Sequence, residues 1–314
     1  MAISDKDKKK LRVAVLYGGW SAEREVSLDS GEACAGAIER AGYKIVELID
    51  VTPDIAKSLE KKRPDVAFNA LHGKWGEDGC IQGILEVMRI PYTHSGVLAS
   101  ALAMHKEKAK ALYRQAKIPV ARSKIVDLDR ELVDHPLMLP YVIKPVAEGS
   151  SVGVRIVRED ENAPVGNLFT KEQYGDEVMV EEYVGGRELT CAVMGNVALG
   201  VIDIVSMGDF YNYDSKYVPG GSKHILPAEI PTSIYRKVQS YSLKAHEILG
   251  CRGVSRSDFR YDETADESDQ LIILETNTQP GMTGTSLVPE LAEHAGHSYE
   301  ELVDWMIKDA SCDR

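Results

Sequence analysis

Residues 254–261 read VSRSDFRY, and residues 271–277 read LIILETN. Both segments have the composition of β-strands, and a polar turn rich in Asp and Glu separates them. Side chains two positions apart on a strand share a face, so an antiparallel pairing of these strands would bring Asp258, Glu275 and Asn277 together. Two carboxylates and an amide oxygen are suitable ligands for Mg²⁺. The alternative is that Arg256, on the same face as Asp258, neutralises the acids in a structural ion-pair network.

The N-terminal third alternates short apolar runs with helical patterns. Strands are predicted at 11–17, 43–50 and 65–71, with a helix that ends at Ala41. This alternation indicates a parallel sheet that is covered on both faces and binds ligands beyond the carboxyl ends of its strands. The loops 18–27 and 72–79 each follow a strand, so we expect them to face one crevice. The first loop lacks G-x-G-x-x-G spacing, which disfavours a dinucleotide oxidoreductase.

The rest of the chain has closely spaced strands and two long helices. A Lys- and Ala-rich helix is predicted at 102–115 and an amphipathic helix at 232–249, with a final helix at 298–308. Glycine turns at 185–186 and 195–196 favour an antiparallel sheet. Its predicted strands are 139–144, 154–157, 178–184, 188–194 and 197–205.

The bulk composition is typical of a globular protein and disfavours several classes. A formal net charge of −12 repels nucleic acid and anionic membranes. No apolar run reaches the roughly 18 residues of a membrane helix, and the N-terminus lacks a signal-peptide core, so we expect a cytoplasmic protein. The cysteines have no CxxC spacing and are interpreted as reduced packing residues, not as disulfides or zinc ligands. They are Cys34, Cys80, Cys191, Cys251 and Cys312.

A phosphate-binding segment is predicted where Lys144 ends an apolar strand and EGSSVG follows at 148–153. The glycines let backbone N–H groups approach oxygen atoms closely, and Ser150 and Ser151 add hydroxyl donors. No Gly-Lys-Ser/Thr closes the loop, so it is not a Walker A motif. An ordinary surface turn is the alternative. A second lysine, Lys106, lies on the helix that opens the middle region, where a solvated surface charge is the other interpretation.

Three acidic residues and one histidine are further candidates. Glu181 and Glu188 lie near strand ends, where they could accept hydrogen bonds from an adenine amino group and ribose hydroxyls, although an exposed edge strand explains them equally well. Glu23 could hold a substrate ammonium group or complement a helix N-terminus. His72 shares the expected mouth of the crevice.

Six segments, in this order and spacing, make the chain resemble the D-alanine–D-alanine ligase family of the ATP-grasp superfamily. They are GGWSAEREVSL (18–28), ALHGKWGEDGCIQG (70–83), VIKPVAEGSSVGV (142–154), YDSKY (213–217), SRSDFRYD (255–262) and LETNTQPGMTGTSLVPE (274–290). The resemblance runs from about 13 to 305. It implies an α/β and α+β ATP-grasp fold with an N-terminal Rossmann-like domain at 1–101, a central subdomain at 102–186 and a C-terminal domain at 187–314.

The resemblance also implies an activity, its cofactors and the residues that serve them. The family ligates two D-alanines for peptidoglycan synthesis, cleaves ATP to ADP and phosphate through a D-alanyl phosphate, and uses two Mg²⁺ or Mn²⁺ ions. Asp258, Glu275 and Asn277 would hold the metal ions. The implied partners are D-alanine, ATP and a second copy of the chain in a homodimer, without nucleic acid or membrane. Residues that match the family's ATP site are Lys106, Lys144, Ser151, Glu181, Tyr183, Val184, Glu188 and Lys216.

At the amino-acid end, the resemblance implies that Glu23 binds the first ammonium group, with hydrogen bonds to Ser150 and Tyr217 and with His72 nearby. Arg256 and the backbone N–H of Gly281 would stabilise the oxyanion of the tetrahedral intermediate. Gly281, Ser286 and Leu287 would receive the second D-alanine. A lid at 206–225, which carries Tyr211, Tyr213, Lys216 and Tyr217, would close over the acyl phosphate and exclude water.

Three alternatives stand beside this assignment. Ligases that take D-lactate or D-serine as the second substrate differ in the Lys-Tyr pair of the lid, and Lys216-Tyr217 is intact here. Another ATP-grasp carboxylate–amine ligase is the second alternative. The third is a nucleotide-binding regulator without turnover, which the complete set of metal ligands disfavours.

Overall fold

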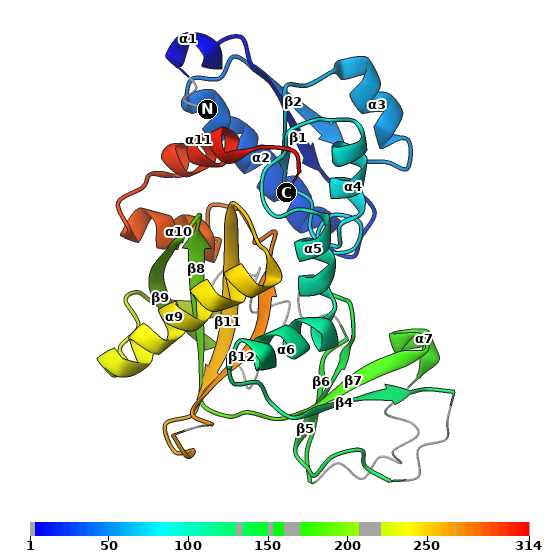
Figure 1. Cartoon of the computed structure of the whole chain (residues 1–314), viewed down its shortest axis with the longest axis vertical. Coiled ribbons are helices and arrows are strands. Elements are labelled where there is room, and N and C mark those ends of the chain that lie inside the picture. The colour runs from blue at the N-terminus through cyan, green and yellow to red at the C-terminus, as the bar shows by residue number, and fades with distance from the viewer. Residues whose placement is uncertain are drawn as a thin grey trace.

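The computed structural model describes residues 4–129, 134–149, 153–159, 170–206, 221–267 and 269–313. In Figure 1 a parallel sheet with its helices lies at the top, the larger antiparallel sheet lies at the lower left, and a smaller one lies at the lower right. Within these ranges, none of the helices combines the length and apolar character that crossing a bilayer requires.

The parallel sheet has the order β2-β1-β3 and is covered on both faces, as predicted. Its strands are β1 (Arg12–Tyr17), β2 (Ile45–Asp50) and β3 (Val66–Asn69), and the helices packed on it are α2 (Arg24–Arg40), α3 (Ile55–Lys62), α4 (Cys80–Val87) and α11 (Tyr299–Asp309). Successive side chains of β1 alternate between the two faces. Val13 and Val15 join the core formed with α2 and α11, whereas Ala14 and Leu16 pack with α3 and α4.

The helix predicted at 102–115 is wrong as a single element. The structure has two helices, α5 (Val97–Met104) and α6 (Lys106–Gln115), with His105 in an extended conformation between them. The break has a backbone cause, because the N–H of Lys106 donates to the carbonyl of Val146 at 3.0 Å. Lys106 therefore begins α6 beside the end of a strand instead of lying in mid-helix.

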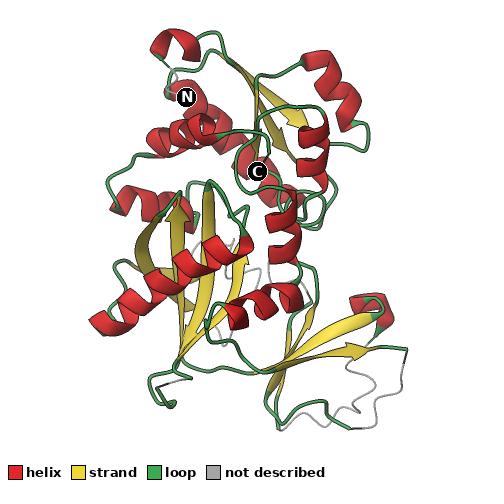
Figure 2. Ribbon diagram, viewed as in Figure 1, coloured by secondary structure: helices red, strands yellow, loops and turns green. Residues whose placement is uncertain are grey.

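The predicted single antiparallel sheet is also wrong, since the structure has two. The smaller has the order β4-β7-β5-β6 and the larger the order β10-β9-β8-β11-β12, shown in Figure 2 as separate sets of yellow strands. The strands of the smaller sheet are β4 (Ser123–Asp127), β5 (Tyr141–Pro145), β6 (Arg155–Val157) and β7 (Glu177–Glu182). Those of the larger sheet are β8 (Arg187–Met194), β9 (Val197–Ser206), β10 (Ser222–Ile225), β11 (Val254–Tyr261) and β12 (Leu271–Asn277).

Of the two predicted glycine turns, one joins strands of the same sheet and the other joins the two antiparallel sheets. Gly195 lies in the hairpin between β8 and β9, as predicted. Gly186 instead lies in the connection from one sheet to the other, with φ at +82°. A Cβ atom there would lie 2.2 Å from the carbonyl oxygen of Tyr261, so only glycine fits this close approach to β11.

The larger sheet has helices on both faces. It packs against α9 (Thr232–Leu249) and α10 (Leu287–His294), among others. The described residues also form two short helices, α1 (Asp5–Lys8) and α7 (Lys171–Tyr174). One face of the larger sheet packs against α5, α6 and α9, and the other against α10 and α11.

All five cysteines are free. Cys34, Cys191 and Cys251 are buried, where desolvation raises the pKa of each thiol to about 12, but Cys80 is exposed and is not the packing residue that was predicted.

Candidate active site

A cleft lies where the two antiparallel sheets meet. The smaller sheet supplies Lys144 and Glu181, the larger supplies Asp258 and Glu275, and α6 supplies Lys106. Most residues expected at the nucleotide and metal ends line this one cleft. They are Lys106, Lys144, Glu181, Tyr183, Val184, Glu188, Asp258 and Glu275. An adjoining pocket is lined by Asn277 together with Lys106 and Glu275.

The acid cluster is formed by the expected pairing of β11 with β12. The strands are antiparallel, with Asp258 opposite Glu275 and Arg256 opposite Asn277. A register shift follows Asp258, and beyond it Phe259 pairs with Ile273. Among the residues that the structure describes, no group of three His, Cys, Asp or Glu side chains could hold a metal ion. A site at this cluster therefore needs the amide oxygen of Asn277 as its third protein ligand.

Asp258 is buried and held by three neighbours. Arg256 donates from Nε and Nη2 to its two oxygens, at 2.9 and 2.7 Å. Thr190 donates from Oγ1 to Oδ1 at 2.6 Å, and the amide nitrogen of Asn277 lies 3.1 Å from Oδ2. The ion pair weighed as the alternative to a metal site is therefore present. This ion pair holds the Asp258 carboxylate in one orientation. It also compensates the buried charge, which would be costly without a partner.

Lys106 and Lys144 bring positive charge to the opposite side of the cleft. Lys106 is 8% exposed; its Nζ donates to the carbonyl of Glu148 and lies 4.0 Å from Oε2 of Glu275. Burial lowers the pKa of Lys106, against the opposing effect of Glu275. The Nζ of Lys144 donates to Oε2 of Glu181. Two lysines beside a carboxylate cluster form a site suited to a polyanion that arrives with its own cations.

Glu181 accepts from a second lysine as well. Lys110 lies one turn after Lys106 on α6, is 1% exposed, and donates to Oε1 of Glu181. Burial would raise the pKa of Glu181, but the charges and hydrogen bonds of Lys144 and Lys110 lower it below its usual range. Both carboxylate oxygens are thus engaged by lysines. Glu181 therefore holds Lys144 in place, and its contact with adenine stays a prediction.

Glu23 is buried against two glycines of different loops. It precedes α2 and is 5% exposed. A Cβ atom built on Gly149 would lie 2.7 Å from Oε1 of Glu23, and one built on Gly73 would lie 2.8 Å away. The Glu23 carboxylate therefore lies between the loop after β3 and the loop after β5. The loops 18–27 and 72–79 also contact each other directly, because Ser21 donates to the carbonyl of His72 at 2.8 Å.

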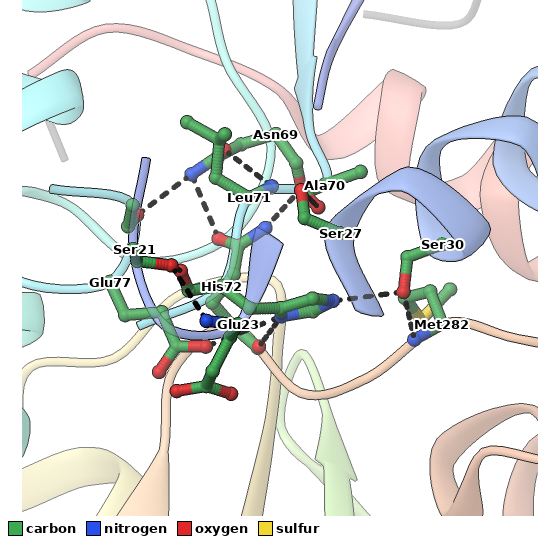
Figure 3. Close-up of polar contacts among 12 residues, drawn as sticks. Ser21, Glu23, Ser27, Ser30, Asn69, Ala70, Leu71, His72, Glu77 and Met282 are labelled. Atoms are coloured by element: carbon green, nitrogen blue, oxygen red, sulfur yellow. Dashed lines mark hydrogen bonds and ion pairs between the residues drawn. The ribbon is translucent and has the colours of Figure 1, made fainter. Parts of the chain in front are cut away.

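His72 is the centre of a buried polar network (Figure 3). Its Nε2 lies 2.9 Å from the hydroxyl of Ser30, and its Nδ1 lies 3.3 Å from Glu77 and 3.2 Å from the carbonyl of Gln279. Burial alone would lower the pKa of His72, but the hydrogen bond and charge of Glu77, with the charge of Glu23, raise it above the ordinary value. His72 therefore links the parallel-sheet region to the segment that follows β12.

That segment carries the remaining substrate candidates. The hydroxyl of Ser286 accepts from the N–H of Thr283 at 2.9 Å, and a Cβ atom on Gly281 would lie 3.0 Å from it. Leu287 is buried as the first residue of α10. The N–H of Met282 donates to Ser30 at 3.4 Å, so one hydroxyl contacts both this segment and His72. The expected positions of Ser150, Ser151, Lys216 and Tyr217, with Tyr211 and Tyr213, lie outside the described residues.

The sequence matches two protein-family models. One is described as the D-ala D-ala ligase C-terminus and matches residues 112–308; the other is the D-ala D-ala ligase N-terminus and matches 49–95. A D-alanine–D-alanine ligase of Parvibaculum lavamentivorans is 60% identical over 96% of this chain and 98% of its own. The chain belongs to the D-alanine–D-alanine ligase family. A ligase of Rhizobium meliloti is 59% identical over 96% of this chain and 98% of its own.

Solved structures of the ligase family have the same fold. A Bacillus anthracis D-alanine–D-alanine ligase complexed with ATP has a TM-score of 0.78 and 30% identity, over 95% of this chain and 96% of the other. A second structure of that enzyme has a TM-score of 0.80 and 31% identity, over 95% and 97% of the two chains. These matches confirm the ATP-grasp fold that the resemblance implied.

Four buried or half-buried polar residues of this ligase-family chain were not predicted. Lys110 has a signal in the sequence, since it follows Lys106 by four residues and shares its helix face. Arg260 likewise follows Asp258 by two residues on β11. Asn69 and Gln279 have no such signal, because their amides meet across 210 positions, with Asn69 Nδ2 at 3.0 Å from Gln279 Oε1.

Proposed function

We propose that the chain joins two D-alanine molecules into D-alanyl-D-alanine and converts ATP to ADP and phosphate. One observation carries the proposal: in a member of this ligase family, two lysines and the Asp258–Glu275 pair line one cleft between two sheets. Such a cleft suits a triphosphate that enters with divalent cations. The product would serve peptidoglycan synthesis, and the use of ATP supports a cytoplasmic location.

At the nucleotide end, Lys106 and Lys144 neutralise phosphate oxygens, while Tyr183, Val184 and Glu188 hold the nucleoside. The first D-alanine carboxylate attacks the γ-phosphorus, the bond to the β-phosphate oxygen breaks, and ADP leaves with a D-alanyl phosphate in place. The amine of the second D-alanine then attacks the acyl carbon and phosphate departs. Charge neutralisation and positioning are the main contributions that a protein makes to such transfers.

Asp258, Glu275 and Asn277 would hold Mg²⁺ or Mn²⁺, two ions in all. The donor set fits, because all three offer hard oxygen ligands from facing strands and Asp258 is already held as a carboxylate by Arg256. When bound, the ions would neutralise phosphate charge. Arg256 then has two roles, as a partner of Asp258 and as a donor to the oxyanion together with the N–H of Gly281.

At the amino-acid end, Glu23 binds the ammonium group of the first D-alanine. Its burial between Gly73 and Gly149 supports this role, because a carboxylate in that position can meet a small cationic group away from bulk water. His72 borders the same loops, and Ser286 and Leu287 receive the second D-alanine. Ser150, Ser151, Lys216 and Tyr217 keep the roles that the resemblance implies, with the last two in a lid.

Three domains and a homodimer complete the proposal. The boundary at 186/187 coincides with the connection between β7 and β8, whereas α5 spans the boundary at 101/102. The domains would be 1–101, 102–186 and 187–314. Light scattering coupled to gel filtration measures whether the mass in solution is twice the 34.6 kDa of one chain.

A product assay tests the reaction itself. The purified chain is incubated with ATP, Mg²⁺ and D-alanine, either alone or together with D-serine or D-lactate. Products are identified by mass spectrometry, and the released ADP is measured. We expect ADP release to require D-alanine and to match D-alanyl-D-alanine mole for mole. A mixed product in preference to the dipeptide would identify a D-lactate or D-serine ligase. Nucleotide binding without ADP release would identify a regulator.

A further inference from the structure

We propose that Arg260 is a positioning residue that clamps the connection between the two sheets and thereby fixes the nucleotide-binding wall of the cleft. The inference rests on the proposed function, since it assigns a task within the proposed nucleotide site. Arg260 lies on β11 and lines the cleft with Tyr183, Val184 and Glu188.

The guanidinium of Arg260 holds two carbonyls of the connection from β7 to β8. Its Nε donates to the carbonyl of Val184 at 3.1 Å, and its Nη2 donates to the carbonyl of Gly186 at 2.8 Å. Residues 183–186 are the passage from the smaller sheet to the larger (Figure 1). The planar guanidinium fixes both carbonyls in one geometry, which a lysine could not do with its single ammonium group.

The third partner of Arg260 is Glu188, directly opposite it in the β8–β11 ladder. Nη1 of Arg260 lies 3.2 Å from Oε2 of Glu188, and the two side chains are 16% and 14% exposed. In this half-buried position the pair is worth more than a surface ion pair. Loss of Arg260 would remove this cation from Glu188, which lines the part of the cleft where the nucleoside is proposed to bind.

Arg260 therefore acts where the two walls of the cleft join. The connection also packs closely on β11 at Gly186, beneath the carbonyl of Tyr261. The clamp and the glycine contact together fix the angle between the wall that carries Lys144 and the wall that carries Asp258. A nucleotide that must touch both walls binds tightly only when this angle is set in advance.

Arg187 provides a matched control. It precedes Glu188 on β8, pairs with Asp203 at 3.1 and 2.6 Å, and donates to the carbonyl of Glu229 at 2.8 Å. Like Arg260, it combines a carboxylate with a backbone carbonyl. Among the described residues that line the cleft, Arg187 is absent. Arg187→Met thus removes a similar structural contact away from the proposed nucleotide site.

The test compares ADP affinity by calorimetry, and KM values for ATP and D-alanine, in the wild type, Arg260→Met, Arg260→Lys and Arg187→Met. We expect Arg260→Met to weaken ADP binding by about ten- to a hundredfold, the range for lost hydrogen bonds to a charged group. The KM for ATP should rise in parallel, while that for D-alanine changes by less than about threefold. Arg260→Lys should bind ADP with intermediate affinity, and it provides the measurement if Arg260→Met does not fold.

ADP affinity within about twofold of wild type in the Arg260 variants would overturn the clamp, as would an equal loss in Arg187→Met. A wild-type protein that binds ADP but forms no dipeptide would refute the proposed ligation and leave the clamp testable by calorimetry. A wild-type protein that binds no ADP would overturn both.

Discussion

Asp258 and Glu275 lie opposite each other across the β11–β12 pair, on the face that lines the cleft. Asp258 is fixed by Arg256, Thr190 and Asn277, whereas Glu275 lies beside Lys106. The two acids thus have different partners. One is held by its own strand and the neighbouring β8 and β12, and the other faces the lysine that begins α6. Lys106 therefore brings a positive charge to the acid pair from outside the larger sheet.

We expect His72 to make a pH-dependent contribution to the free energy of unfolding. The pKa of His72 is raised in the folded protein, so protonation stabilises the fold. This contribution is fully present below the unfolded value of about 6.5 and is lost as the pH rises through the folded pKa. The difference in free energy of unfolding between the wild type and His72→Gln should therefore shrink from about pH 5 to about pH 9. Urea denaturation across that range measures it.

His246 is a control of opposite sign for this experiment. It is buried beside Ser255, and desolvation lowers its pKa to about 4. Its contribution to stability is present above about pH 6.5 and is lost as the pH falls toward the folded value. The difference between the wild type and His246→Gln should grow with pH over that window. Parallel trends for the two histidines would contradict the assigned environments.

Gly149→Ala tests the position of Glu23. The added Cβ atom would lie 2.7 Å from Oε1 of Glu23, so that carboxylate must move. We expect the KM for the first D-alanine to rise by about tenfold or more, as for a charge-assisted hydrogen bond that is lost. Gly83→Ala is the control, because nothing lies within 4 Å of its Cβ position and alanine favours a helix. Equal kinetics in the two variants would refute the site.

Lys110→Met tests the role of the lysine that sequence patterns did not identify. Its removal leaves Glu181 with Lys144 alone in a buried site, and breaking such a pair lowers the free energy of unfolding by about 3 kcal/mol. The KM for ATP should rise too, because Lys144 loses its fixed partner. Arg122→Met removes the exposed neighbouring pair with Glu182 and should change neither quantity appreciably. Denaturation and initial-rate kinetics on both variants give the comparison.

Local patterns were sufficient to predict the two strands of the acid cluster and the long helix α9. The ends of α9, β11 and β12 lie where the sequence predicted them, because amphipathic and apolar periodicity determines all three. The convergence of Asp258 with Glu275 followed from the period of a strand and from the assumed pairing. Lys106 and Glu23 were candidates that each had an ordinary structural alternative, and the resemblance to the ligase family decided their expected roles, since a lone charge on a helix or in a loop has no distinctive local pattern.

What the sequence could not predict depends on distant contacts. The break at His105 arises from a hydrogen bond to Val146, and the separation of two antiparallel sheets depends on the approach of Gly186 to β11. The strand β4 was missed because most of its side chains are exposed, so it lacks a clear apolar face. The amide pair Asn69–Gln279 joins segments 210 positions apart, and no local window contains both.

The turnover of Asp258→Asn, measured as ADP and D-alanyl-D-alanine formation over a Mg²⁺ titration, is the decisive test of the metal and nucleotide site. The substitution keeps the shape of the side chain and removes the charge that pairs with Arg256 and would hold the metal ion. We expect kcat to fall by about a hundredfold or more, the order found when an electrostatic contact to the transition state is lost, and the Mg²⁺ requirement to rise. Turnover close to wild type at low Mg²⁺ would contradict the assignment of this cleft as the site of ATP-driven ligation.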